Sequence, residues 1–216
     1  MQICNPEHSK FLGLMINSRL SWQTHIDQMI PKLNTAAYAI RSLKQVVKLE
    51  TLKIAYFAFT HSLLSYSIIF WGISKHSNTI FKIQKRMIRI IMNFDSRTSC
   101  RNLFTPLGIL PLQSQYIYSL MSFVSTNREL FVNNADIHNF STRSQKDLHL
   151  PIANLSVFQK GVYFSGIKIY NNLPTGIKQM SYDTLNFKKA VKRFLLDKSF
   201  YSLDEYYKWK ENALSR

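Results

Sequence analysis

Residues that could carry an enzymatic reaction are sparse and scattered in this sequence. The 12 Asp and Glu residues occur singly except for Asp204 and Glu205, which open the last expected helix, where negative charge suits the helix dipole. None of the six histidines lies three or four residues from a carboxylate or from another histidine. Neither a G-x-S-x-G elbow nor a glycine-rich phosphate loop occurs. The sequence therefore predicts no catalytic residue and no complete active site.

Metal binding and secretion are also not predicted. Cys4 and Cys100 lie far apart, without a CxxC motif or a Cys/His partner at ligand spacing, so we expect neither a zinc site nor a disulfide framework. No Asp-Asp turn that could bind a divalent cation occurs. The first residues lack both a basic region and a long apolar stretch, so a secretory signal is not expected. We expect a protein that is not secreted and works inside the cell, in the nucleus or the cytoplasm.

Cationic side chains, in contrast, are abundant and regularly spaced. The chain has 28 Lys and Arg residues and a formal net charge of +16. Basic residues outnumber acidic ones by 10 up to Leu110 and by 6 from Pro111 onward, so the excess belongs to the whole chain. Two rows have helical spacing: Lys82, Lys85, Arg86 and Arg89, and Lys188, Lys189, Lys192 and Arg193. Such rows are either solvated helix faces or surfaces for a polyanion, meaning nucleic acid or an anionic membrane, and the overall charge favours a surface for a polyanion.

The first basic row lies in an amphipathic helix expected over residues 80–93. Its apolar residues recur every three or four positions, opposite the cations. They are Ile80, Ile83, Met87, Ile90, Ile91 and, just beyond, Phe94. The second row lies in a helix expected to begin at the cap Thr184, where cations alternate with Phe187, Val191 and Phe194. One face of each helix would be core and the other cationic.

Further helices are expected on both sides of these two. Thr24 and Asp27 indicate a capping box for a helix that runs to about Lys44 and is kinked by Pro31 or begins near it. The next helix is expected from Leu49 to Tyr66, with Trp71-Gly72 ending it. Three consecutive helices with short links predict an antiparallel bundle. Shorter helices are expected at 99–104, closed by Gly108, then after Pro111, over 157–173, and after the Ser202–Glu205 cap.

Two segments are expected to be non-helical. Residues Lys10–Ile16 resemble a short buried strand for which the sequence offers no obvious partner. Residues Asn133–Leu155 lack periodicity and are expected to form a long loop and the best domain boundary. The expected fold class is mainly α, a helical bundle with a short N-terminal β strand or hairpin and a C-terminal helical extension.

The segment Ile54–Ile73 contains 20 residues without a formal charge, which is about the ~20 that a membrane span requires. Six hydroxyl or imidazole side chains would be costly in lipid, and lysines lie on both sides. We therefore expect a buried helix of a bundle and no membrane partner, with membrane association kept as an alternative. Trp71, Tyr163 and Tyr170 could stack on bases if exposed, or pack in the core.

In their order and spacing, several short motifs between residues 10 and 197 resemble one protein family. They are Lys10-Phe11-Leu12-Gly13, Leu20-Ser21-Trp22, His25-Ile26, Tyr66, Phe70-Trp71-Gly72, Ile83-Gln84-Lys85-Arg86, Arg89-Ile90, Leu107-Gly108-Ile109-Leu110-Pro111-Leu112, Thr142-Arg143 and Asn171-Asn172-Leu173-Pro174. The chain resembles the C-terminal part of the reverse transcriptase (RNA-directed DNA polymerase) of non-LTR, LINE-type, jockey-like retrotransposons, which are transposable elements.

This resemblance implies a division into four parts: the end of the palm at 1–22, a helical thumb at 23–132, a linker at 133–155 and a C-terminal extension at 156–216. It implies that Leu12 and Gly13 lie near the primer terminus, where glycine permits close backbone approach. The row Lys82, Lys85, Arg86 and Arg89 would face the RNA/DNA template-primer. The acidic motif that binds Mg²⁺ in the parent polymerase is absent, as are the fingers and most of the palm. Taken alone, the chain is therefore expected to bind nucleic acid without catalysis.

Three alternatives remain open at this point. The chain could be one piece of a split polymerase whose palm is supplied separately. It could be a nonfunctional relic. It could also be a basic scaffold for protein partners.

Overall fold

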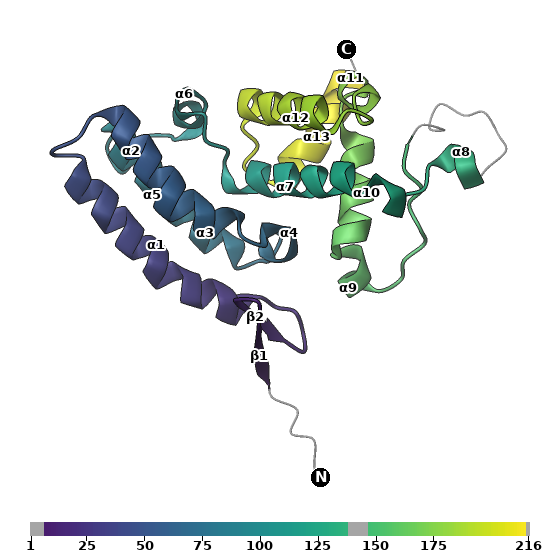
Figure 1. Cartoon of the computed structure of the whole chain (residues 1–216), viewed down its shortest axis with the longest axis horizontal. Helices are drawn as coiled ribbons and strands as arrows, with labels where there is room; N and C mark the ends of the chain where they lie inside the picture. The colour runs from purple at the N-terminus through teal and green to yellow at the C-terminus, as the bar shows by residue number, and fades with distance from the viewer. Residues whose placement is uncertain (1–6, 138–146, 215–216) are drawn as a thin grey trace, which may run out of the picture. The chain divides into compact units, whose positions relative to one another are not determined.

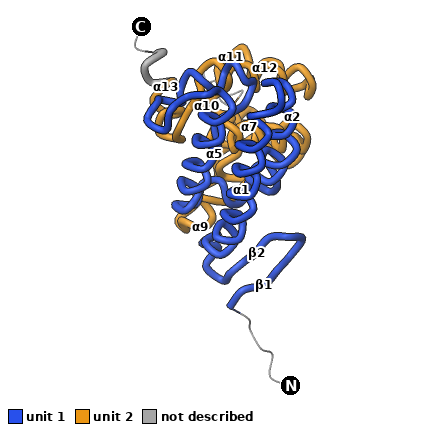
Figure 2. Tube along the Cα trace, turned by 90° about the vertical axis from the view of Figure 1, so that its left-hand side faces the viewer, with its two compact units in different colours: residues 1–112 blue, residues 113–216 orange. Residues whose placement is uncertain are grey.

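The computed structural model describes residues 7–137 and 147–214. The fold is mainly helical, with a two-stranded antiparallel hairpin at the N-terminal end, as the sequence predicts (Figure 1). The chain forms two compact units, residues 1–112 and 113–216 (Figure 2). The division falls within the range 23–132 assigned to the thumb, and not within 133–155. This division reflects how the helices pack, and it does not show which residues correspond to a palm, a thumb or a C-terminal extension.

The N-terminal hairpin replaces the single strand expected over Lys10–Ile16. Strand β1, His8–Phe11, pairs with β2, Leu14–Asn17, so that His8 faces Asn17 and Phe11 faces Leu14. Leu12 and Gly13 form the connecting turn with φ of 45° and 81°, which is the backbone that two-residue hairpin turns require. The expectation of an unpaired strand was wrong, because β1 is exposed along its whole length and lacks the apolar alternation that marks a strand.

Unit 1 is built around two long helices that lie side by side, α1 (Gln23–Leu43) and α5 (Ser77–Met92) (Figure 1). They run in the same direction, since Asn34 contacts Arg86 and Lys44, just beyond α1, contacts Asn93. The expected capping box is absent: Trp22 is the N-cap residue, in the left-handed conformation, and no side chain caps the helix. Pro31 lies inside α1, which continues through it.

The chain returns between these helices through a segment that is not the single helix expected. Helix α2 (Leu49–Ala55) leads into a π-helix, η1 (Tyr56–His61), then α3 (Ser62–Ser65) and α4 (Ile68–Trp71). The wider turn of η1 accompanies two buried polar contacts, from Gln84 Nε2 to Tyr56 Oη at 2.9 Å and from Thr60 Oγ1 to Met87 Sδ at 3.2 Å. Ser67, with φ of 51°, breaks the helix before α4. No helix in the described part of the chain is long and apolar enough to cross a membrane.

Near the end of unit 1 a short helix is closed by Gly108, as the sequence predicts, but the α-helix begins at Phe104 and not at Ser99. The 3₁₀ turn η2 (Arg101–Leu103) continues into α6 (Phe104–Leu107), and Gly108 ends α6 with φ of 66°. Pro111 then directly precedes α7 (Leu112–Thr126), which supplies the first long helix of unit 2.

Unit 2 continues through short elements into three longer helices. The short elements are η3 (Arg128–Leu130), α8 (Asn134–Ile137), α9 (Ser156–Gln159) and α11 (Thr175–Gln179). The longer ones are α10 (Val162–Asn172), α12 (Thr184–Lys198) and α13 (Leu203–Leu214). Gly166 of α10 lets this helix approach α7, because a Cβ there would lie 3.0 Å from Val124 Cγ2.

Several local predictions in unit 2 need correction. The helix expected over 157–173 is broken before α10 by Gly161, whose ψ of 155° is extended. The range 133–155 is not all loop, since it contains α8 and a bridge between Asn133 and Leu148. The cap of α12 is Asp183, not Thr184, because the Asp183 carboxylate accepts hydrogen bonds from the Leu185 and Asn186 amides. The Ser202 cap is confirmed: its Oγ accepts from Glu205 N at 3.1 Å.

Candidate nucleic-acid interface

The first basic row covers the outer side of α5. Ile80, Met87 and Ile91 of this helix are buried, as the periodicity predicts. Phe94 differs from the prediction: it lies beyond the end of α5 and is 47% exposed. Lys82 and Arg86 are exposed. The helix contains neither Asp nor Glu, so every charged side chain on it is cationic.

The two arginines of this row are oriented by uncharged acceptors. Arg86 Nη2 donates to Asn34 Oδ1 at 2.6 Å, and Arg89 Nε donates to the Thr98 carbonyl at 2.7 Å. These contacts restrict the side chains without neutralising their charge, which is the arrangement expected where an anion binds. Lys85 Nζ lies 4.6 Å from the centroid of the Phe81 ring. Lys85 and Arg89 are both half-buried.

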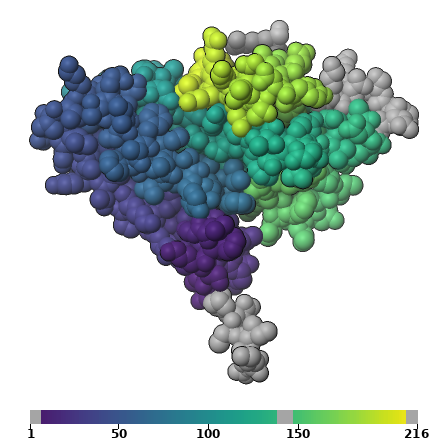
Figure 3. All heavy atoms as spheres, in the orientation of Figure 1, coloured from purple at the N-terminus to yellow at the C-terminus, as the bar shows by residue number. Residues whose placement is uncertain are grey.

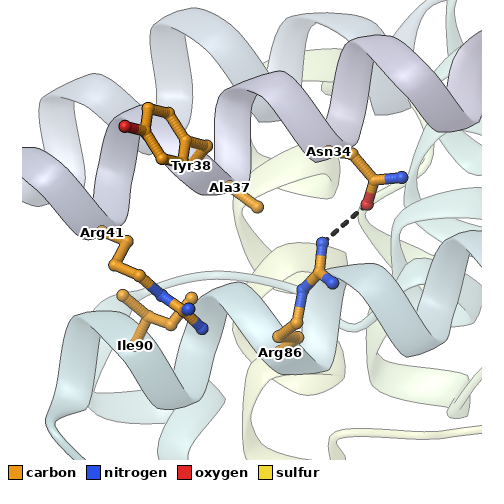
Figure 4. Close-up of a pocket in the computed structure, with 6 residues that line it drawn as sticks. All are labelled: Asn34, Ala37, Tyr38, Arg41, Arg86 and Ile90. Carbon is orange, nitrogen blue, oxygen red and sulfur yellow. Dashed lines mark hydrogen bonds between the residues drawn. The ribbon is translucent and has the colours of Figure 1, made fainter.

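A groove between α1 and α5 continues this cationic surface. It has a volume of about 300 Å³ and is lined by Asn34, Ala37, Tyr38, Arg41, Arg86 and Ile90. Figure 4 shows both guanidinium groups between the two helices, with Arg41 coming from α1 and Arg86 from α5. No residue of the lining is acidic. Tyr38 is 74% exposed, although it belongs to a helix whose other face is core.

Sequence reasoning missed Tyr38 and Arg41. The periodic apolar residues of α1 predict its buried face, but they do not indicate which residues on its polar face are functional. The two residues are three positions apart and therefore lie on one side of the helix. This spacing was the available signal, whereas the pairing of α1 with α5 that places Arg41 near Arg86 is a tertiary feature.

The second basic row lies on α12 in unit 2. Lys189, Lys192 and Arg193 are exposed, opposite the buried Phe187 and Val191. Lys188 is half-buried and donates from Nζ to Thr126 Oγ1 at 3.0 Å, so it also ties α12 to α7. The row thus has three outward cations and one that is partly structural. Each basic row is contained in its own unit.

The aromatic residues suggested for base stacking are mostly unavailable. Trp71 is fully buried and Tyr170 is 3% exposed, so core packing is correct for both. Tyr163 is partly exposed, but its ring stacks on Phe131 with centroids 5.0 Å apart. Tyr38, in contrast, is an exposed ring beside the cationic surface of α5.

Leu12 and Gly13 occupy the turn of the hairpin, which lies at one end of unit 1 and is darkest purple in Figure 3. Phe11 and Leu12 are exposed, while Leu14 packs inward. Tyr66 Oη donates a hydrogen bond to the Leu12 carbonyl. A Cβ on Gly13 would lie 3.7 Å from the Tyr66 ring, so space permits a side chain there but the positive φ disfavours it. The turn therefore presents apolar side chains on a fixed backbone.

The two asparagines of the Asn171-Asn172-Leu173-Pro174 motif have structural contacts. Asn171 exchanges two hydrogen bonds of 2.8 Å with the main chain of Leu148, and Asn172 Nδ2 donates to the Tyr206 carbonyl at 3.1 Å. The hydrogen bonds of Asn171 therefore hold the segment around Leu148 against α10, and the hydrogen bond of Asn172 connects α10 to α13. Thr142 and Arg143 lie outside the described residues.

Two other groups that could do chemistry, the His25 imidazole and the Cys100 thiol, are buried. Burial and the nearby Lys32 lower the pKa of His25, which lies between Trp22 and Trp71. Burial raises the pKa of the Cys100 thiol, so this cysteine stays protonated near neutral pH. Among residues 7–137 and 147–214, no three His, Cys, Asp or Glu side chains gather as they would around a metal ion.

No protein-family model, no curated protein and no solved structure matches this chain.

Proposed function

We propose that the outer face of α5, together with α1, binds the sugar-phosphate backbone of nucleic acid. The observation that carries this proposal is the row of four cations on α5 in the absence of any acidic residue on that helix. Arg86 and Arg89 are held by neutral oxygens, so both guanidinium groups keep their full charge for phosphates. Backbone contacts of this kind are tolerant of sequence and sensitive to salt.

We further propose that the chain is the palm end, thumb and C-terminal extension of a non-LTR retrotransposon reverse transcriptase, and that its natural ligand is an RNA/DNA template-primer. Two features support this proposal. The Leu12-Gly13 turn presents exposed Phe11 and Leu12 as a primer-gripping hairpin would, and the basic helix α5 belongs to the same compact unit. We propose binding alone for this chain, and not the Mg²⁺-dependent nucleotidyl transfer of the family.

The test is the affinity of the purified chain for a blunt RNA/DNA hybrid, measured over a salt series. We expect the dissociation constant to rise steeply with salt, since each phosphate contact adds about 0.7–0.9 to the log-log slope. The double variant Lys82→Ala/Arg86→Ala should bind more weakly and reduce this slope by about 2. Both side chains are exposed, so the fold should be retained, with the loss of the exposed hydrogen bond from Arg86 to Asn34.

A matched control changes the same charge elsewhere in unit 1. Lys48 and Lys75 are also exposed, and Lys48→Ala/Lys75→Ala should leave the slope nearly unchanged. Equal losses in the two double variants would show that binding follows net charge alone. That outcome would contradict a specific role for α5.

A further inference from the structure

We propose that the groove between α1 and α5 holds one unpaired nucleotide of a bound strand, with its base stacked on Tyr38 and its phosphate between Arg41 and Arg86. This inference deepens the proposed function and rests on it. It adds a recognition of bases to a surface that otherwise contacts only phosphates.

The groove has the size and charge that a single nucleotide requires. Its volume of about 300 Å³ lies at the lower end of the range of small-molecule sites, about 300–1,000 Å³. Two of its six lining residues are arginines, one from each helix, and none is acidic. Asn34 Oδ1 accepts from Arg86 Nη2 at 2.6 Å and so orients this guanidinium before a ligand arrives. A phosphate between the two arginines would meet fixed donors on one side and a more mobile exposed side chain on the other.

Tyr38 supplies an exposed aromatic ring, which phosphate binding does not need. Its side chain lines the groove at 74% exposure, one helical turn before Arg41. A large exposed ring contributes little to folding, whereas it offers a flat apolar surface to a base. Figure 4 shows the Tyr38 ring in front of α1, on the same helix as Arg41, with its hydroxyl pointing away from the two guanidinium groups.

The same geometry favours an unpaired base over a paired one. In a duplex both faces of each base are covered by neighbouring bases, so a side chain cannot stack on them without unstacking. In a single strand or an overhang the faces are free, and stacking on aromatic side chains is the usual mode of binding. The groove should therefore distinguish single-stranded from blunt double-stranded nucleic acid.

The experiment compares two single-stranded DNA oligomers of equal length, one oligothymidylate and one with abasic sites in place of every thymidine. The two have the same phosphates, so their difference reports the bases alone. The full chain should bind oligothymidylate more tightly. The Tyr38→Ala variant should lose about 5-fold or more of the oligothymidylate affinity and should bind the abasic strand like the wild type.

Three further variants sharpen the assignment. Tyr38→Phe keeps the ring and should bind like the wild type. Arg41→Ala/Arg86→Ala should weaken binding of both strands, since both carry phosphates. Tyr182→Ala removes a tyrosine that is 90% exposed and does not line the groove, and it should leave the preference for thymidylate unchanged.

The outcomes separate this inference from the proposed function. Equal binding of the two strands by the wild type, or an equal loss on both in Tyr38→Ala, would overturn the nucleotide site. If free thymidine monophosphate displaced the oligomer and bound as tightly as the oligomer does, the groove would be a site for a free nucleotide and not for a nucleotide within a strand. The proposed function is judged separately by the salt dependence of blunt hybrid binding, which Tyr38→Ala should not change.

Discussion

The hydroxyl of Tyr66 donates a hydrogen bond to the main-chain carbonyl of Leu12, which lies 54 residues earlier in the chain. Tyr66 is the first residue after α3, and Leu12 is in the hairpin turn. A second contact, from Ser74 Oγ to the Ser21 carbonyl at 3.0 Å, lies beyond the other end of the hairpin. These two contacts connect the residues on either side of β2 to the segment that follows α3.

Removing the Tyr66 hydroxyl should loosen the hairpin selectively. In Tyr66→Phe the ring remains beside Gly13 but the hydrogen bond, worth about 1 kcal/mol, is lost. We expect amide hydrogen exchange in His8–Asn17 to become about 5-fold faster, with little change in the exchange of α5. Tyr182→Phe removes a hydroxyl from a ring that is 90% exposed and serves as the control. Unchanged exchange in the hairpin of Tyr66→Phe would mean that strand pairing alone holds it.

Gln84 should be critical for the core of unit 1. Its Nε2 donates to Tyr56 Oη and to the Leu110 carbonyl, both at 2.9 Å, in a buried environment. Gln84→Met conserves volume but leaves both oxygens without this donor, at a cost of about 2–4 kcal/mol in the free energy of unfolding. Tyr56→Phe removes only one of the two acceptors and should cost less, about 1 kcal/mol. Urea unfolding followed by tryptophan fluorescence measures both, and a Gln84→Met protein as stable as the wild type would contradict this role.

Protonation of His25 should destabilise the protein as the pH falls. Burial and then Lys32 lower the pKa of His25 in the folded state from its ordinary value of 6.5. Below pH 6.5 the unfolded chain therefore binds a proton that the folded chain resists. The contribution of His25 to the free energy of unfolding is therefore complete above pH 6.5. It falls by about 1.4 kcal/mol for each pH unit between 6.5 and the lower folded-state pKa of His25.

The variant His25→Phe tests this effect because it keeps an aromatic ring next to Trp22 and Trp71 but cannot titrate. Urea unfolding at several values between pH 5 and pH 8 should give a smaller decline for the variant than for the wild type. The slope is the readout, so a difference in absolute stability does not affect the test. Parallel declines would assign the pH dependence to other groups.

Substitution of two glycines of unit 2 by larger residues should change the stability of the protein in opposite directions. A Cβ at Gly166 would lie 3.0 Å from Val124 Cγ2 and 3.7 Å from Phe131 Cε1, so Gly166→Val should destabilise by about 1–3 kcal/mol. Gly176 lies in α11, where a Cβ would meet no atom within 4 Å, so Gly176→Ala should stabilise by about 0.4–1 kcal/mol. Thermal unfolding of the two variants gives the sign of each effect. A Gly166→Val protein as stable as the wild type would contradict the packing described for α10 against α7, and a destabilised Gly176→Ala protein would contradict the open space at Gly176.

The sequence by itself determined the features that depend on neighbours along the chain. The apolar residues of α5 recur with the helical period, and this fixed both its core face and its cationic face, because a helix places residues three and four apart on one side. Gly108 at the end of α6 and Ser202 before α13 were predictable for the same reason, since a positive φ and a hydroxyl cap act within one turn. The mainly helical fold class follows from these local signals.

Only the tertiary structure decided what distant segments do to one another. The hairpin exists because His8–Phe11, a segment without an apolar pattern, pairs with Leu14–Asn17. The π-helix at Tyr56–His61 and its contact with Gln84 depend on α5, which is 28 residues away at that contact. The groove that joins Tyr38 and Arg41 to Arg86 arises from the parallel packing of α1 against α5. Packing contacts and hydrogen bonds between remote residues leave no periodic mark on a single sequence, so the candidate nucleotide site became visible only in the folded chain.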